Sequence, residues 1–184
     1  MAREVDNVWV GADGRAYFGS TTATAPTDAT GALAGEWAEL GWISEDGLTE
    51  AASESYNEIK AWDGTVARKV LTGSERTFAL TFLESNEHTL EFYYSGDVVS
   101  AISGGSKIEV TTPSRVQWSM CFDVVDGSNT CRIYAANVEV TGRGDVVYKN
   151  GEAVGWNITV TAYPDTNGVV FTKFFDVDLS DTES

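Results

Sequence analysis

Apolar and polar residues alternate with a period of two in three separate segments, and this pattern constrains the fold more than any other feature of the chain. Phe78, Leu80 and Phe82 are separated by small or polar residues in the first segment, and residues 118–124 and 156–162 alternate in the same way. Successive side chains of a strand point to opposite faces of a sheet, so each segment has one apolar face. We therefore predict a mostly β protein, an antiparallel β-sandwich or barrel.

Weaker alternation predicts further strands, and turn sequences lie between several of them. The weaker segments are residues 6–10, 15–19, 37–43, 48–53, 66–72, 106–112, 131–141, 145–149 and 168–175. Asp-Gly and Asn-Gly pairs favour the positive φ angles that tight hairpins need. Such pairs occur at Asp13-Gly14, Asp46-Gly47, Asp126-Gly127 and Asn150-Gly151. We expect local hairpins to build most of the fold.

One short flanking helix is expected at residues 86–94, where apolar side chains have the i, i+3, i+4 spacing of a helix face. Ser85 or Asn86 can cap its start, and Gly96 can end it. The apolar side of this helix should pack on a sheet.

The chain is predicted to form a single domain over residues 1–184, because its length lies in the usual single-domain range. Two long loops are expected, at residues 20–35 and 54–65. The first loop consists of small and polar residues and is rich in turn residues. The second carries apolar and charged residues without strand alternation. The acidic tail at residues 176–184 is expected to be mobile.

The charge balance argues against a protein that grips nucleic acid or a membrane. Asp and Glu number 28 against 12 Lys and Arg, which gives a formal net charge of -16. Binding to a phosphate backbone needs basic residues that neutralise it. Residues 1–20 contain no apolar run of signal-peptide length, and no later stretch is long and apolar enough for a membrane helix. The sequence thus indicates an acidic protein made in the cytosol.

No recognisable catalytic frame is present, and we expect neither an enzyme nor a bound cofactor or metal. The single histidine, His88, lies on the expected helix without a nucleophile motif around it. Glu45 and Asp46 directly precede Gly47, so this pair of carboxylates indicates a hairpin turn rather than an acid/base site. The acidic stretch at residues 165–168 lacks the spacing of a full calcium loop.

The two cysteines, Cys121 and Cys131, flank the Asp126-Gly127 turn almost symmetrically. On a hairpin they would lie near one another. A reducing compartment favours free thiols, with a disulfide in a released particle as the alternative.

Three motifs follow one another in the first half of the chain. WAELGWISEDGLTE occupies residues 37–50, IKAW residues 59–62, and TFALTFLESN residues 77–86. In order and spacing they resemble the tail tube (major tail) proteins of long-tailed bacteriophages of actinobacteria and their prophages. The resemblance is good over residues 36–96, whereas the later strands agree only in pattern.

The resemblance implies a structural virion protein of the phage tail, assembled in the host cytoplasm. It implies hexameric rings that stack into a tube, whose inner sheets join into one barrel through which DNA passes without specific binding. A tape measure protein and tail tip and terminator proteins are the implied partners. Contacts between subunits are expected from the loop at residues 54–65, at Tyr56, Ile59, Lys60 and Trp62. The expected lumen-facing residues are Glu50, Thr77, Thr81 and Asp123.

Two other functions stay open at this point. One is a ligand-binding module, such as a sugar-binding or adhesin-like β-sandwich, in which Trp37, Trp42 or Trp62 would stack on the ligand. The other is a different virion part, such as a tail terminator or a capsid decoration protein.

Overall fold

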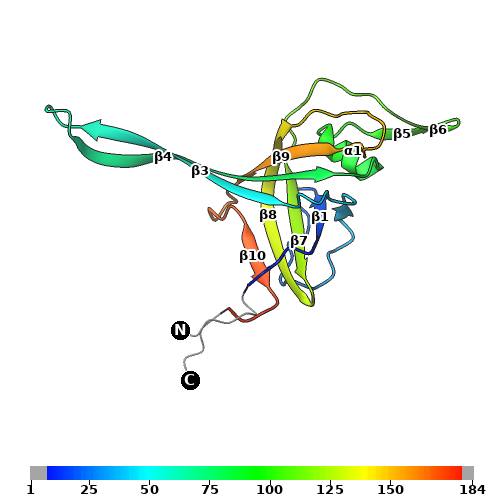
Figure 1. Cartoon of the computed structure of the whole chain (residues 1–184), viewed down its shortest axis with the longest axis horizontal. Helices are drawn as coiled ribbons and strands as arrows, with labels where there is room; N and C mark the ends of the chain where they lie inside the picture. The colour runs from blue at the N-terminus through cyan, green and yellow to red at the C-terminus, as the bar shows by residue number, and fades with distance from the viewer. Residues whose placement is uncertain (1–7, 180–184) are drawn as a thin grey trace.

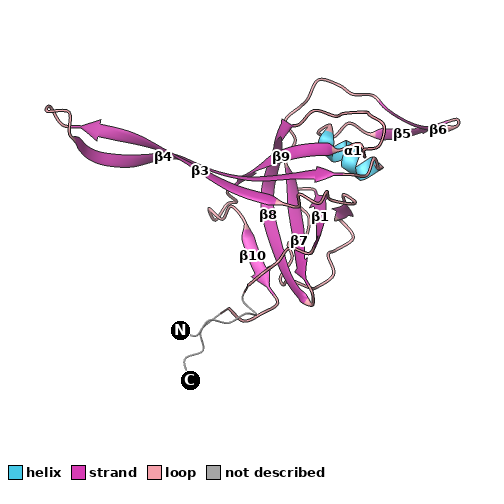
Figure 2. Ribbon diagram, in the orientation of Figure 1, coloured by secondary structure: helices cyan, strands magenta, loops and turns pink. Residues whose placement is uncertain are grey.

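Antiparallel strands make up most of the chain, as expected, and the only helix among the described residues is short (Figures 1 and 2). The computed structural model describes residues 8–179. Its elements are β1 (Asp13–Gly19), β2 (Ala38–Glu39), β3 (Thr49–Lys60), β4 (Val66–Phe82), α1 (Glu87–Tyr93), β5 (Val99–Ile102), β6 (Gly105–Ile108), β7 (Trp118–Asp126), β8 (Asn129–Arg143), β9 (Trp156–Tyr163) and β10 (Thr172–Phe175). The predicted mostly β class with one flanking helix is confirmed.

The main sheet has the strand order β2-β1-β7-β8-β9-β4-β3, and β10 pairs with the first half of β8. The chain after β2 closes this sheet on itself. Leu40 N–H donates to the Ala16 carbonyl of β1 at 2.9 Å, and a few residues later Ser44 N–H donates to the Thr81 carbonyl of β4 at 2.8 Å. One continuous stretch of chain therefore bridges β1 and β4, the strands next to the two ends of the strand order, which closes the sheet into a barrel. The hairpin β5–β6 forms a separate two-stranded sheet.

Alternate residues of the strands fill the barrel with apolar side chains. Phe78, Phe82 and Phe122 are almost completely buried and pack with Met120 and Ile158 in one core cluster. These are the apolar positions of the three period-two segments, so the alternation did mark the inward face.

Helix α1 packs against the barrel as expected. Asn86 caps it, accepting a hydrogen bond from Thr89 N–H at 2.8 Å. Its Phe92 ring lies against Phe18 of β1 at 5.3 Å and near Trp118 of β7 at 6.2 Å. Tyr94 is its C-cap, and Ser95 and Gly96 follow in left-handed conformations with φ of 57° and 96°, so the helix end begins at Ser95, one residue before the expected Gly96.

The segment at residues 20–37, which includes the loop expected at residues 20–35, contains no strand. It covers the outer face of β7 and β8. Arg132 of β8 donates to the Gly31 carbonyl at 2.7 Å, and the ring of Trp37 lies 6.1 Å from that of Tyr134. This part of the sheet is therefore covered on both faces.

The prediction of a second long loop at residues 54–65 is wrong. Residues 54–60 continue strand β3, and only residues 61–65 form a turn. Together with β4 they build one long hairpin that projects from the barrel (Figure 1). Every residue of β3 is exposed. Period-two alternation arises when one face of a strand is buried, so a ribbon exposed on both faces lacks that signal.

Several smaller expectations also need correction. Asp13-Gly14 is not a turn, because both residues pair with β7 inside β1. Residues 145–149 form no strand, and the described part of 6–10 forms none. Residues 66–72 are the first half of β4, and β5 was missed. Of the expected mobile tail, residues 180–184 lie outside the described residues, whereas Asp176 accepts a hydrogen bond from Thr130 N–H at 2.8 Å.

The two cysteines lie on opposite faces of the sheet, so the disulfide alternative fails. Cys131 pairs with Val124 and faces the core, whereas Cys121 pairs with Tyr134 and faces outward. Both thiols are free and buried. A hairpin places two residues close together only when they are cross-strand partners, and these two are not.

Candidate assembly surfaces

The distal part of the β3–β4 hairpin, residues 53–75, is called the arm. Within the described chain, its strands pair only with each other, because β9 first contacts β4 at Arg76. At about 3.3 Å per residue, the ten residues from Ser53 to Trp62 extend about 30 Å from the barrel. An isolated two-stranded ribbon is marginally stable in water, which indicates that something covers the arm when the protein functions.

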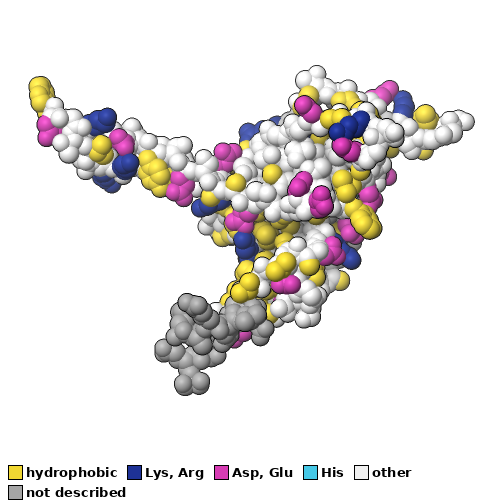
Figure 3. Space-filling model, in the orientation of Figure 1, with side chains coloured by type: hydrophobic (Ala, Val, Ile, Leu, Met, Phe, Trp, Pro, Cys, Tyr) yellow, Lys and Arg dark blue, Asp and Glu magenta, His cyan; other side chains and the backbone are white. Residues whose placement is uncertain are grey.

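Apolar side chains are exposed on both faces of the arm. Tyr56 and Leu71 are cross-strand partners on one face, and each is about half exposed. Ile59 lies on the other face and is 51% exposed. Trp62 at the turn is fully exposed, and Figure 3 shows hydrophobic side chains at the end of the arm. The arm is therefore suited to contacts on two sides rather than to lying flat on one surface.

The outer arm has an unusual charge for this protein. Residues 58–69 carry three basic and two acidic residues, a net charge of +1, in a chain of net charge -16. Lys69 forms an ion pair with Glu58 at 2.9 Å. Among the described residues, Lys60 and Arg68 have no such carboxylate partner. Two cations at the arm's end are thus available to an acidic partner.

All four residues expected at a subunit interface, Tyr56, Ile59, Lys60 and Trp62, lie on the arm. The turn that carries Trp62 is held by Asp63, which accepts a hydrogen bond from Thr65 N–H at 2.9 Å. That backbone hydrogen bond lowers the pKa of Asp63. Trp62 is therefore presented by an ordered turn.

A second surface, called the polar face, covers the outer side of β4, β9 and the end of β8. Thr77, Thr161 and Glu139 are successive cross-strand partners on it, and Thr81 pairs with Asn157. The Asn157 amide donates to Thr81 Oγ1 at 2.9 Å. The side chains of this surface are mainly small hydroxyls and amides, and few are charged. The surface is therefore polar and should bind other molecules only weakly.

The lumen-facing candidates do not share one face. Thr77 and Thr81 lie on the polar face. Glu50 pairs directly with the buried Phe78, so it lies on the opposite side of the sheet, where its carboxylate is 2.6 Å from Lys173 Nζ. Asp123 is buried beneath the segment at residues 20–37. Its two carboxylate oxygens accept from the Arg132 guanidinium at 2.7 and 2.8 Å. Asp123 is therefore not a surface residue of this chain.

The motifs at residues 37–50 and 77–86 contact each other, and the sequence analysis did not predict these contacts. Gly41 has a φ of 82°, and a Cβ atom there would lie 2.8 Å from the Glu84 carboxyl carbon. That carboxylate accepts a hydrogen bond from Trp42 N–H at 3.1 Å and one from the Asn86 amide at 3.3 Å. Thr89 donates its hydroxyl to the Leu40 carbonyl. The co-occurrence of the motifs was the signal for this junction.

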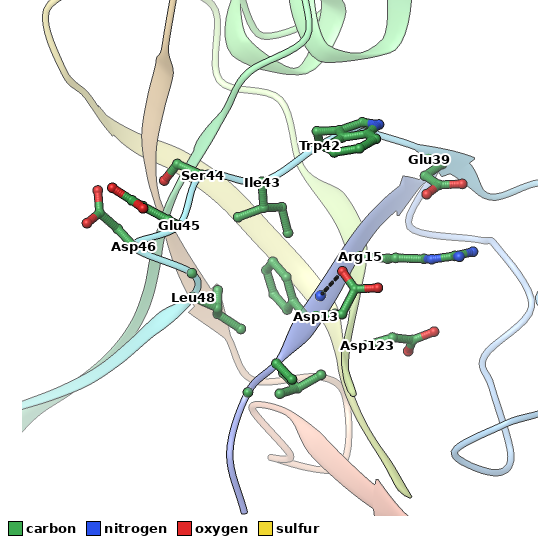
Figure 4. A pocket seen from close by; sticks show the side chains of 17 residues that line it. Asp13, Arg15, Glu39, Trp42, Ile43, Ser44, Glu45, Asp46, Leu48 and Asp123 are labelled. Carbon is green, nitrogen blue, oxygen red and sulfur yellow. Dashed lines mark hydrogen bonds between the residues drawn. The ribbon is translucent and has the colours of Figure 1, made fainter. Parts of the chain in front are cut away.

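This junction presents Trp42 to solvent, 76% exposed, at the rim of a groove. The groove has a volume of about 730 Å³ and lies between β1 and the turn at residues 42–48 (Figure 4). Ile43, Leu48, Phe122 and Val124 supply its apolar lining. Figure 4 shows Glu45 and Asp46 on the turn and Asp13 and Arg15 across from them on β1.

One wall of the groove is an unpaired strand edge. β1 pairs with β7 along its whole length, but β2 pairs only with Tyr17 and Phe18. Gly14 N–H, on the part of β1 that β2 does not reach, donates to the carboxylate of Asp13 at 2.8 Å (Figure 4). The exposed carboxylates around the groove, Asp13, Glu39, Glu45 and Asp46, outnumber its one arginine, Arg15.

The three tryptophans that a ligand-binding module could use for stacking do not lie on one surface. Trp37 packs on Tyr134, Trp42 lies at the groove, and Trp62 is at the end of the arm. The ring centroids of His88 and Phe18 lie 6.1 Å apart, with the ring planes inclined at 61°. The part of the chain that the structure describes holds no cluster of three metal-ligating side chains, and no helix in it is long and apolar enough to cross a membrane.

Comparison with known proteins identifies one family. A family model described as phage tail tube protein matches residues 1–183 of the chain. Among curated protein sequences, none matches. Among solved structures, a chain of the sheath-tube complex of an extracellular contractile injection system in the extended state is similar, with 10% identity, 95% of each chain covered and a TM-score of 0.48. A chain of the anti-feeding prophage baseplate has 11% identity, covers 87% of this chain and 92% of its own, and has a TM-score of 0.43.

Proposed function

The chain belongs to the phage tail tube protein family, and we propose that its copies form hexameric rings that stack into the tube through which phage DNA passes. The family makes it a structural component of a phage tail. The ring order, the stacking and the passage of DNA are the proposal. Closed rings agree with the general preference of homo-oligomers for closed symmetry, in which strand edges are covered rather than exposed.

The observation that carries this proposal is the arm. A ribbon of 23 residues pairs only with itself among the described residues and exposes large apolar side chains on both faces. Monomeric proteins rarely expose such surface without a partner. Tyr56, Ile59, Lys60 and Trp62 are therefore the proposed contacts between subunits.

We propose the polar face as the wall of the lumen, with Thr77 and Thr81 among its residues. DNA that moves through a tube must not adhere to it, and hydroxyl and amide side chains offer no phosphate-neutralising charge. Arg115 is the basic side chain that contacts this face, and it is 2.6 Å from the Glu139 carboxylate. A tape measure protein inside the tube and tip and terminator proteins at its ends are the further partners.

Electron microscopy and sedimentation of the purified full chain over a range of concentrations test the proposal. We expect rings or tubes with sixfold symmetry above a threshold concentration. A chain that sediments as a monomer at every concentration, and also in extract of phage-infected cells, would overturn it. Copy number from mass spectrometry of particles separates a tube protein, present many times, from a terminator or a decoration protein.

A further inference from the structure

We propose that the groove between β1 and the turn at residues 42–48 is the receptor for the arm of a second copy of this chain. The proposal rests on the tube function above and names the surface that the arm contacts. It concerns a part of the barrel that the arm of the same copy leaves uncovered in the structure.

The first argument is charge complementarity. The exposed rim of the groove carries Asp13, Glu39, Glu45 and Asp46 against Arg15. The outer arm is net positive, and Lys60 and Arg68 lack an ion-pair partner within the described chain. Opposite charges on two surfaces of one protein favour a contact between copies and fix its register.

The second argument is backbone geometry. No strand pairs with residues 13–16 of β1 on the edge that forms the groove wall, where Gly14 N–H donates to the Asp13 carboxylate and the Ala16 carbonyl accepts from Leu40 N–H. In the arm, β3 and β4 each have an outer edge that pairs with nothing in the described chain. An added strand satisfies such edges with main-chain hydrogen bonds, while side-chain pockets provide specificity. The groove and the arm therefore offer complementary backbones as well as complementary charges.

The third argument is the anchor. Trp42 is exposed at the groove rim, yet its backbone is fixed on both sides, because its N–H donates to Glu84 and its carbonyl accepts from Leu83 N–H at 2.8 Å. A rigidly held aromatic loses little entropy on binding and is typical of interface hot spots. A basic side chain of the arm can lie over its ring in a cation–π contact.

Charge reversal tests the contact in the full chain. We expect Glu45→Lys/Asp46→Lys and, separately, Lys60→Glu/Arg68→Glu to raise the threshold concentration for tube formation about tenfold or more, because both place like charges in apposition. The four changes combined should restore assembly. Glu109→Lys/Glu152→Lys, which alters net charge equally at exposed positions outside the groove, is the matched control and should assemble normally.

A crosslink identifies the contact directly. The pair Glu45→Cys/Lys60→Cys should form intermolecular disulfides in oxidised tubes, whereas Glu152→Cys/Lys60→Cys should not. If wild-type tubes form but charge reversal has no effect and the first pair does not crosslink, the groove is not the receptor while the tube function stands. If wild-type chains never assemble, both proposals fall.

Discussion

Trp42 and Glu84, 42 residues apart in the chain, are joined by a hydrogen bond from the Trp42 backbone N–H to the Glu84 carboxylate at 3.1 Å. Gly41 makes this contact possible, because it is left-handed and leaves room for the carboxylate. The junction links the chain before β3 to the start of α1, and thereby fixes the barrel closure and the position of Trp42.

Replacing Gly41 with Ala should destabilise the fold by about 2 kcal/mol or more, from left-handed strain and from contact with Glu84. For a chain of this length, that lowers the melting temperature by roughly 5 °C. Gly47→Ala is the control, since Gly47 is also left-handed but has open space around it. Thermal unfolding measures both, and equal losses would show that the Glu84 contact contributes nothing.

Replacing Trp62 with Ala should block assembly and leave the melting temperature of the unassembled chain nearly unchanged. Trp62 is fully exposed, so its truncation opens no cavity. Trp156→Ala is the contrasting variant, because Trp156 is 5% exposed and packs on Tyr93 at 5.1 Å. It should cost about 3–5 kcal/mol. Assembly of the Trp62 variant at the wild-type threshold would contradict the proposed contact.

Replacing Asp123 with Asn should destabilise the chain by about 3 kcal/mol, because it leaves the Arg132 guanidinium buried without a counter-charge. The segment at residues 28–31, which Arg132 contacts through backbone carbonyls, should then exchange its amide hydrogens faster. Glu139→Gln breaks a pair whose Arg115 is largely exposed and should cost about 1 kcal/mol or less. Unchanged exchange at residues 28–31 would argue against this coupling.

Both thiols should resist alkylation in the native protein at pH 8. Burial raises the pKa of Cys121 to about 12 and also raises that of Cys131. The thiolate is the reactive form, so little of either is available. The unfolded chain should react at both cysteines, and Ser100→Cys on the exposed strand β5 should react in the native state. Rapid native labelling at Cys121 would refute the assignment.

The same shift predicts a loss of stability at high pH. The folded chain keeps the Cys121 proton in a range where the unfolded chain, with a thiol pKa of about 9, loses it. The unfolded state therefore binds fewer protons, and stability falls as pH rises from about 9 towards 12. Cys121→Ser should flatten this part of the stability curve, measured by denaturant unfolding.

Assembled tubes should show no saturable DNA binding at low ionic strength, where screening is weakest. Thr81→Lys/Asn157→Lys, which places two cations on the polar face, should create binding that weakens steeply with salt. Glu109→Gln/Glu152→Gln, which raises the net charge by the same two units at exposed positions away from this face, is the charge-matched control. Saturable binding by wild-type tubes would show that the polar face is not a non-adhesive lumen wall.

The sequence by itself determined the half-buried strands, most tight turns and the short helix. Phe78, Phe122 and Ile158 alternate with polar residues because each strand of the barrel faces a core on one side and a polar surface on the other. Gly47 and Asn86 act on their immediate neighbours, so a turn and a helix cap are visible in a few residues. The three motifs also identified the family, which the match over residues 1–183 confirms.

Only the tertiary structure decided where distant segments meet. The arm has no alternation because neither face is buried in its own chain, so residues 54–60 gave no strand signal. Asp123 is buried because residues 28–31 lie over it, and Cys121 and Cys131 face apart because of the register between β7 and β8. Periodicity reports whether a side chain faces a core, whereas the identity of the covering segment depends on long-range packing, which no local pattern contains.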